Sequence, residues 1–377
     1  MFRSKMANPN IIFFVVFAAA SVNSQTTLRA LATSRGIHMG AAVKSGTRTA
    51  QYDTVLAREY NTVVAENDMK FGNIEPTQNN FIWTAADNLA NFTQAHAMSM
   101  RGHNFVWHQQ GGYAATYNGT RAQMLAILKN HILTVGGRYA GRIYEWDVVN
   151  EAIDDATNGL RTSFWQQRIG NDYIDSAFKW ARQADPNAWL VYNDYSAEGS
   201  GAKSNAVYNL VSGLQSRGIP INGVGLQCHF SLNGFDTAAL STNMKRIAAL
   251  GLNISITELD IRIPTPATTA QLDAQKQNYK AMLAVCLSNP NCKTFMTWGF
   301  TDASSWVPGF YPGYGAALPF DANYQPKPAY TGMIEALTAA TPLSPVQGRN
   351  RLLERSRPFD LLGRAKVSWR KISIPIP

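Results

Sequence analysis

The sequence is poor in cysteine, with only three among its 377 residues. Cys286 and Cys292 flank the short segment 287–291 and form the natural disulfide pair, while Cys228 is expected to be a buried thiol near a strand end. No cysteine occurs after residue 342, which argues against a small disulfide-stapled binding module at the C-terminus. One disulfide bond within a larger fold is therefore expected.

Histidine is also scarce, and its six occurrences include no His-x-x-x-His pair of the kind that binds zinc. The paired-carboxylate chemistry inferred below needs no metal either. We therefore expect neither a metal site nor a cofactor.

A convincing membrane-spanning run is missing as well. The apolar run at residues 11–20 is too short to cross a bilayer comfortably. Two basic residues precede it and small or polar residues at 22–24 follow it, a pattern typical of a secretory signal peptide over residues 1–24. We expect a secreted, extracellular protein without a membrane-bound part in its mature form. The sequons at Asn91 and Asn118 are the expected glycan sites.

Charged residues make up only 16% of the sequence, yet the formal net charge is +9. Most of this charge lies at the ends, because residues 1–24 contribute two positive charges and segment 342–377 contributes an excess of six. Residues 25–341 are therefore close to neutral, which gives no case for nucleic-acid binding. The segment 342–377 shows neither helical nor alternating periodicity, so we expect a disordered basic tail.

Short β-rich segments alternate with longer amphipathic segments through residues 25–341, which is typical of repeated βα units. Strands are expected at 37–43, 62–65, 100–107, 144–151, 189–193, 223–228, 253–258 and 294–300. Helices are expected at 51–60, 83–98, 121–135, within 163–184, and at 203–217, 238–250, 271–286 and 328–339. Eight such units predict an α/β fold with a single (β/α)8 TIM barrel.

Seven of the eight expected strands end in polar or aromatic residues that a functional site can use. These residues are Glu66 and Asn67, His108, Asn150 and Glu151, Asn193 to Tyr195, Gln227 and His229, Glu258, and Trp298. The carboxyl ends of the strands in such a barrel meet on one face, where enzymes of this fold place their chemistry. The sequence therefore predicts one site built from many strand ends.

Two strand-end glutamates, Glu151 and Glu258, indicate the chemistry of that site. A lone glutamate is more often a solvated loop acid, but two carboxyl groups that face one substrate suffice to cleave a glycosidic bond. The polar neighbours of Glu258, with a hydrogen bond expected from His229, favour an anion there. Asp147 shares the strand face of Glu151, but it occurs four residues earlier and should lie deeper in the barrel.

Residues 25–341 resemble the family 10 glycoside hydrolases, which are endo-β-1,4-xylanases. Six ordered segments account for the resemblance: 66–70 (ENDMK), 101–108 (RGHNFVWH), 146–151 (WDVVNE), 225–229 (GLQCH), 254–260 (ISITELD) and 297–302 (TWGFTD). The closing segment 324–330 and the Cys286–Cys292 pair resemble fungal, secreted members of the family.

The resemblance implies endo-hydrolysis of xylan by a retaining double displacement, with Glu151 as the general acid/base and Glu258 as the nucleophile. The other implied site residues bind the substrate or support those that do. They are Glu66, Asn67, Lys70, His108, Asn150, Tyr195, Gln227, His229, Trp298 and Trp306, supported by Asp260 and His103. The implied partners are xylan and xylo-oligosaccharides, and the protein is expected to be a monomer.

Some of these residues also have purely structural interpretations. His103 fits a core histidine as well as a site residue, and Trp107 and Trp146 are expected in the barrel core. After His108 most relatives continue into a Pro-x-Trp segment, whereas this chain has Gln-Gln-Gly-Gly-Tyr at 109–113. That segment is expected to be a more flexible loop.

Two other functions remain open. A retaining glycosidase of the same fold could prefer β-1,4-glucan. It would need room for a hydroxymethyl group at the non-reducing sugars, beside Glu66, Lys70, Trp298 and Trp306. A sugar-binding barrel that has lost catalysis is the second alternative, although the presence of both glutamates argues against it. The rates of hydrolysis of xylan and of carboxymethylcellulose distinguish a xylanase from the glucan-preferring glycosidase. Binding of the polysaccharide without release of reducing sugar identifies the non-catalytic barrel.

Overall fold

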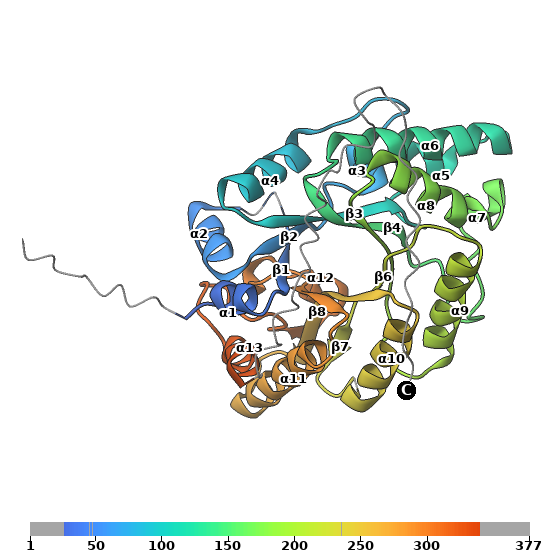
Figure 1. The fold of residues 1–377 in the computed structure, drawn as a ribbon. Helices are drawn as coiled ribbons and strands as arrows, with labels where there is room; N and C mark the ends of the chain where they lie inside the picture. The colour runs from blue at the N-terminus through green and yellow to red at the C-terminus, as the bar shows by residue number, and fades with distance from the viewer. Residues whose placement is uncertain (1–25, 45, 47, 235, 340–377) are drawn as a thin grey trace, which may run out of the picture. The chain divides into compact units, whose positions relative to one another are not determined.

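The computed structural model describes residues 26–339 apart from 45, 47 and 235, and the described residues form a barrel of strands surrounded by helices (Figure 1). Eight of the strands form a closed parallel ring. They are β1 (His38–Val43), β2 (Thr62–Ala65), β3 (Ser99–Val106), β4 (Ile143–Asn150), β5 (Trp189–Asp194), β6 (Gly223–Leu226), β8 (Asn253–Pro264) and β9 (Cys292–Thr297). Strand β1 pairs with β2 on one side and with β9 on the other, which closes the ring. The predicted (β/α)8 barrel is confirmed.

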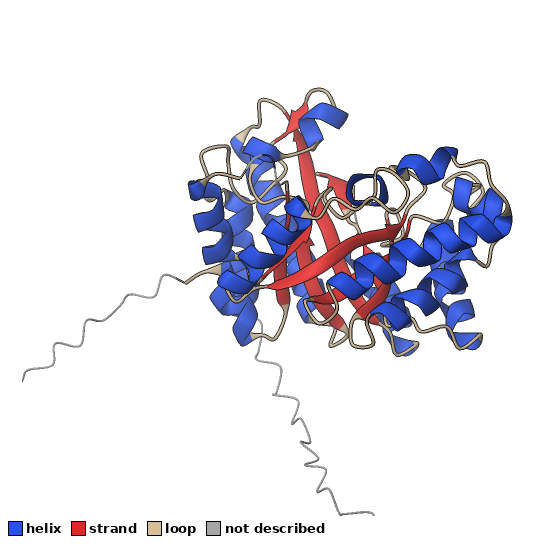
Figure 2. Ribbon diagram, turned by 90° about the horizontal axis from the view of Figure 1, so that it is seen from above, coloured by secondary structure: helices blue, strands red, loops and turns tan. Residues whose placement is uncertain are grey.

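Helices cover the outside of the ring, as Figure 2 shows in blue around the red strands. The helices between the barrel strands and after the last one include α2 (Ala50–Glu59), α4 (Thr84–Ala95), α6 (Arg121–Arg138), α8 (Tyr173–Ala184), α9 (Ala202–Ser216), α10 (Thr237–Ala249), α11 (Thr269–Leu287) and α13 (Pro328–Ala339). Two of them begin after a threonine that forms a reciprocal capping box with a glutamine, Thr120 with Gln123 and Thr268 with Gln271. These caps satisfy backbone N–H groups that the first helical turn leaves without partners.

The structure contains several short helices that were not predicted, among them α3 (Phe71–Ile74) and α12 (Val307–Phe310). An additional short helix, α1 (Leu28–Ser34), precedes the first strand and contacts α13. The helical region expected within 163–184 is divided into α7 (Phe164–Ile169) and α8. Gly170 separates the two helices with a φ of 100°, a left-handed conformation that ends α7.

Strand β8 continues six residues beyond Glu258, where the predicted strand ended. The additional segment leaves the ring and pairs with two short strands, β7 (His229–Ser231) and β10 (Tyr314–Gly315). This pairing aligns His229 with Asp260 and Ser231 with Arg262. Because side chains alternate along a strand, Glu258, Asp260 and Arg262 share one face of the extension.

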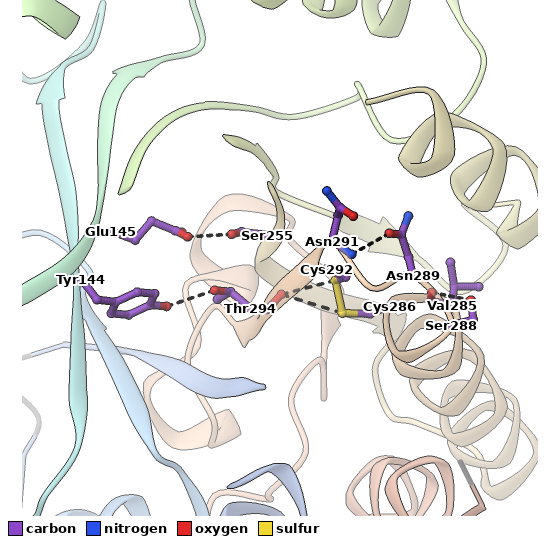
Figure 3. The surroundings of a disulfide bond; sticks show 10 residues. All are labelled: Tyr144, Glu145, Ser255, Val285, Cys286, Ser288, Asn289, Asn291, Cys292 and Thr294. Atoms are coloured by element: carbon purple, nitrogen blue, oxygen red, sulfur yellow. Dashed lines mark hydrogen bonds between the residues drawn. A yellow bond between two sulfur atoms is a disulfide. The ribbon is translucent and has the colours of Figure 1, made fainter. Parts of the chain in front are cut away.

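The barrel interior contains a fully buried charge cluster. Arg101 donates from Nε to Glu145 at 2.5 Å and from Nη2 to Asp147. Ser255 donates to the other carboxylate oxygen of Glu145 at 2.9 Å (Figure 3). The buried charges are therefore paired, as a low-dielectric interior requires. Asp147 lies in this interior, as predicted, and not at the open end of the barrel with Glu151.

A disulfide bond joins Cys286, at the end of α11, to Cys292, at the start of β9 (Figure 3), and it confirms the predicted pair. The backbone N–H of Asn291 donates to Asn289 Oδ1 at 3.0 Å and closes the intervening turn. The bond therefore ties the last helical turn to the barrel strand that follows it. Cys228 is a buried free thiol, as predicted.

The segment 109–113, which was expected to be a more flexible loop, makes close contacts with its neighbours. The backbone N–H of Gly72 donates to the carbonyl of Gln110 at 2.8 Å. A Cβ atom on Gly111 would lie 2.3 Å from an aromatic ring carbon of α7. The segment then enters the short helix α5 (Gly112–Thr116). Close packing therefore requires glycine at these positions, and the flexibility of the segment stays a prediction.

The described residues include no helix that is long and apolar enough to cross a membrane. The expected signal peptide at 1–24 and the expected basic tail at 342–377 lie outside the described residues. Asn91 and Asn118 are both exposed, and their glycosylation, like secretion, stays a prediction.

Candidate active site

The predicted site residues gather in an open cleft of about 620 Å³ at the carboxyl ends of the barrel strands. All but two of the predicted residues line this cleft. The residues that line it are Glu66, Asn67, Lys70, His103, Asn150, Glu151, Tyr195, Gln227, His229, Glu258, Trp298 and Trp306. Of the other two, His108 lines a small cavity next to Glu151, and Asp260 is buried in contact with His229. The cleft wall also contains Trp107, Arg262, Phe310 and Tyr311, which the sequence did not indicate as site residues.

Glu258 is 4% exposed and is held by two neighbours. Asn193 Nδ2 donates to its Oε1 at 2.8 Å, and His229 Nε2 lies 3.2 Å from its Oε2. Burial alone would raise the pKa of this carboxyl, but the hydrogen bond from His229, the charges of His103 and His229, and the amide of Asn193 outweigh burial. Together they lower the pKa of Glu258 to about 2. Glu258 is therefore ionised at neutral pH although it is buried.

His229 owes its positive charge to two carboxylates. Its Nδ1 lies 2.8 Å from Asp260 Oδ2, and its Nε2 faces Glu258. Burial opposes the charged form, but Asp260 and Glu258 raise the pKa of His229 well above its ordinary value. The indole N–H of Trp306 donates to the same oxygen of Asp260 at 2.7 Å. Asp260 thus holds both the imidazolium beside Glu258 and an aromatic wall of the cleft.

Glu151 follows β4 and is 8% exposed, with its backbone in the left-handed region at a φ of 56°. This conformation is uncommon for a residue with a side chain, and hydrogen bonds hold it on both sides. The backbone N–H of Glu151 donates to the carbonyl of Asn193 at 2.9 Å. Its carboxyl accepts from Gln227 Nε2 at 2.9 Å and from the indole N–H of Trp107 at 2.6 Å.

The imidazole beside Glu151 differs in charge from the one beside Glu258. His108 Nδ1 lies 3.8 Å from Glu151 Oε2, which is too far for a hydrogen bond. Burial, assisted by the charge of Arg161, lowers the pKa of His108 to about 4, so this ring is neutral at neutral pH. The two carboxylates therefore have unlike settings, a charged imidazolium beside Glu258 and neutral donors beside Glu151. Such unlike settings are what separates the roles of paired carboxylates.

A chain of amide groups connects the two carboxylates. Asn193 Nδ2 donates to Glu258 Oε1 and to Asn150 Oδ1, each at 2.8 Å. Asn150 Oδ1 also accepts from Gln227 Nε2 at 3.4 Å, and the same Nε2 donates to Glu151. Both carboxylates consequently belong to one hydrogen-bonded frame, which fixes their separation.

Three residues after β2 form a polar row on the cleft wall. Lys70 Nζ donates to Asn67 Oδ1 at 3.0 Å, and Asn67 Nδ2 donates to Glu66 Oε1 at 3.1 Å. Burial lowers the pKa of Lys70, and the charges of three nearby carboxylates, led by Glu258, oppose this effect. The row combines donors and acceptors, which suits the hydroxyl groups of an uncharged sugar.

Trp107 was expected in the barrel core, and this prediction is wrong. Strand β3 ends one residue earlier, and the partly buried indole lies on the cleft wall. Its N–H donates to Glu151, and its ring centre lies 4.9 Å from the ammonium of Lys70. Trp146, by contrast, is in the core, where a Cβ atom on Gly102 would lie 2.1 Å from its ring.

Tyr195 belongs to a network of charged side chains next to Glu151. The sequence did not indicate this network. Its hydroxyl donates to Asp155, which also accepts from Lys203 Nζ at 2.6 Å. The same ammonium lies 3.4 Å from the ring centre of Tyr195. Arg161 donates to Asp155 at 3.2 Å and to the backbone carbonyl of Glu151 at 3.1 Å. The network thereby holds the backbone of Glu151 from the solvent side.

Within the described part of the chain, no group of three or more His, Cys, Asp or Glu side chains is arranged to hold a metal ion. The chemistry expected from the sequence uses the two carboxyl groups, Glu151 and Glu258, and needs no metal. An ionised carboxylate and a second carboxyl in one cleft can act as nucleophile and general acid on a glycosidic bond.

Known proteins resemble this chain over nearly the whole described region. The family model described as Glycosyl hydrolase family 10 matches residues 27–336. Endo-1,4-beta-xylanase B from Thermotoga neapolitana is 38% identical over 336 residues, which cover 87% of this chain and 97% of that protein. An endo-1,4-beta-xylanase from Agaricus bisporus is 38% identical over 278 residues, which cover 74% of this chain and 83% of that protein.

The comparison with solved structures also finds xylanases. The crystal structure of native xylanase 10B from Thermotoga maritima matches with a TM-score of 0.81 at 40% identity, covering 83% of this chain and 98% of that one. Bacterial and fungal proteins both occur among these relatives, so the fungal character suggested by the sequence stays a prediction.

Proposed function

Because the chain belongs to glycosyl hydrolase family 10, we propose that it is an endo-1,4-β-xylanase that cleaves xylan by a retaining double displacement. The observation behind the proposal is the unlike setting of Glu151 and Glu258 in one cleft. A related enzyme, xylanase 10B from Thermotoga petrophila, has been solved in complex with xylobiose, which supports a substrate of linked xylose units.

In the first step Glu258 attacks the anomeric carbon while the bond to the leaving oxygen breaks. Glu151 transfers its proton to that oxygen, so the departing sugar leaves as a neutral alcohol. The product is an α-glycosyl ester on Glu258. Trp107 and Gln227 already donate to the carboxyl of Glu151, and they stabilise the carboxylate that this step leaves behind.

In the second step a water molecule attacks the same carbon, and Glu151 takes its proton as general base. The ester bond breaks and Glu258 departs as a carboxylate. A pKa of about 2 makes Glu258 a good leaving group, because His229 and Asn193 stabilise the anion as it forms. Two inversions at one carbon give net retention.

The test is NMR of the anomeric proton during hydrolysis of xylopentaose. We expect the β-anomer to be released first, because both displacements occur at one carbon. Initial release of the α-anomer would mean that water attacks directly, and the assignment of Glu258 as nucleophile would fall. Binding of xylopentaose without any release would identify the non-catalytic sugar-binding alternative.

The pH dependence of the reaction follows from the pair His229 and Asp260. We expect Asp260→Asn to move the acidic limb of kcat/KM upward by about one pH unit. The low pKa of Glu258 depends on charged His229, and the raised pKa of His229 depends on Asp260. Without that charge the pKa of His229 falls and the pKa of Glu258 rises. Glu258 then becomes protonated at a higher pH, and activity is lost earlier as the pH falls.

A matched control separates charge from packing. Trp306→Phe removes the other hydrogen bond to Asp260 without changing any charge. We expect this variant to raise KM and to leave the acidic limb where it is. An acidic limb that moves equally in both variants, or in neither, would contradict the electrostatic explanation.

A further inference from the structure

The extension of β8 beyond the ring places a cationic side chain on the cleft wall. Arg262 follows Glu258 by four residues, which corresponds to about 13 Å along a strand. Both side chains line the cleft. Arg262 therefore lies outside the reacting centre but within reach of a polymer that fills the cleft.

Arg262 differs from the other cationic groups of the cleft wall in its partners. Lys70 donates to Asn67, and His229 lies between two carboxylates. The guanidinium of Arg262 instead stacks on Tyr311, 4.0 Å from the ring centre. Within the described residues it forms no ion pair and no side-chain hydrogen bond. Its N–H donors are therefore available to a ligand in the cleft.

Aromatic rings position this guanidinium and continue the wall toward the solvent. Tyr311 packs against Trp306 with ring centres 5.7 Å apart, and Trp306 in turn is fixed by its hydrogen bond to Asp260. Phe310 lies 4.9 Å from Tyr311 and is 65% exposed. The rings are tilted or edge-on to one another, so the wall presents an apolar cluster beside a positive charge. This combination matches a sugar ring that bears an acid group.

We propose that Arg262, with Tyr311 and Phe310, binds a carboxylate-bearing substituent, such as a uronic acid, attached to the xylan main chain. This inference rests on the proposed function and adds a substrate class to it. The planar guanidinium can donate two parallel N–H bonds to one carboxylate. Stacking on Tyr311 covers a face of the guanidinium and leaves its edge, where the donors lie, for the ligand. The neutral main chain and its acidic side group are then recognised by different parts of the wall.

Glucuronoxylan and the same polymer after reduction of its carboxyl groups to alcohols form a matched pair of substrates. They share the main chain and differ in whether each side group bears a carboxylate or a neutral hydroxymethyl group. We expect the kcat/KM of the wild-type protein to be about fivefold higher on the acidic polymer at low salt. The preference should shrink as salt screens the charges. In Arg262→Gln the ratio of the two kcat/KM values should fall to about one. Arg262→Lys should give an intermediate ratio, because an ammonium keeps the charge and lacks the planar fork.

The control variant is Lys245→Gln, which removes one positive charge from an exposed position of α10 outside the cleft wall. It should keep the wild-type ratio. An equal ratio in the wild type and in Arg262→Gln, or no preference in the wild type, would overturn the inference. If Arg262→Gln does not fold, the comparison with Arg262→Lys decides, since an unchanged ratio there excludes recognition by the planar fork. Failure of the wild type to hydrolyse xylopentaose and both polymers would overturn the proposed function instead.

Discussion

Replacing Glu258 with alanine is expected to lower kcat on xylo-oligosaccharides by at least about 10⁴-fold, the scale on which hydrolases lose activity without their nucleophile. The shortened side chain leaves space between Asn193 Nδ2 and His229 Nε2, the groups that otherwise hold its oxygens. Azide is a small anion that fits the same positive setting. We therefore expect azide to restore part of the turnover of an aryl xylobioside with a good leaving group.

The configuration of the azide product is the decisive readout. Azide that takes the place of Glu258 attacks once, from the α face, so the product is the α-glycosyl azide. Glu335→Ala is the matched control, because it makes the same change at a surface glutamate of α13 that pairs with Lys276 and Lys280. This control should keep wild-type turnover and should form no azide adduct. Unchanged turnover in Glu258→Ala would remove Glu258 from the role of nucleophile.

The barrel could be predicted because its signals are local and repeated. Each βα unit shows its own change from a short β-rich segment to a longer amphipathic one, and the closing of the ring follows from eight repeats. The extension of β8 is different, because the segment after Glu258 gains its strand partners only from β7 and β10, which are far away in the sequence. The same holds for the glycines at 111 and 112, whose packing against distant backbone and rings cannot be read from local sequence.

The site could be predicted as a set of strand ends but not as a network. Trp107 was placed in the core because the third strand was expected to include it, whereas β3 ends one residue earlier. Glu151 leaves the alternation through its left-handed backbone, a conformation that no residue pattern announces. Asn193 was visible as a polar strand end, but its part in joining the two carboxylates depends on three strands meeting at one point. Side-chain identity can be read from a sequence, and the partner of each side chain cannot.

Replacing Glu151 with alanine is expected to separate substrates by their leaving groups. Hydrolysis of xylan should fall by about 10²- to 10⁴-fold, because the departing sugar oxygen needs the proton that Glu151 supplies. An aryl xylobioside with a strongly acidic phenol needs no such proton, so its kcat/KM should stay within about tenfold of the wild-type value. Its kcat should still fall, because the second step has lost its general base and the glycosyl ester on Glu258 accumulates.

Azide distinguishes this variant from the nucleophile variant on the same substrate. In Glu151→Ala the ester on Glu258 still forms, and azide then attacks it from the opposite face, so the product is the β-glycosyl azide. The two variants are therefore expected to give azide products of opposite configuration, a difference that loss of folding or of substrate binding cannot produce. An equal loss of activity on xylan and on the aryl xylobioside would contradict the role of Glu151 as an acid. The same azide configuration from both variants would contradict the placement of the two carboxylates on opposite faces of the anomeric carbon.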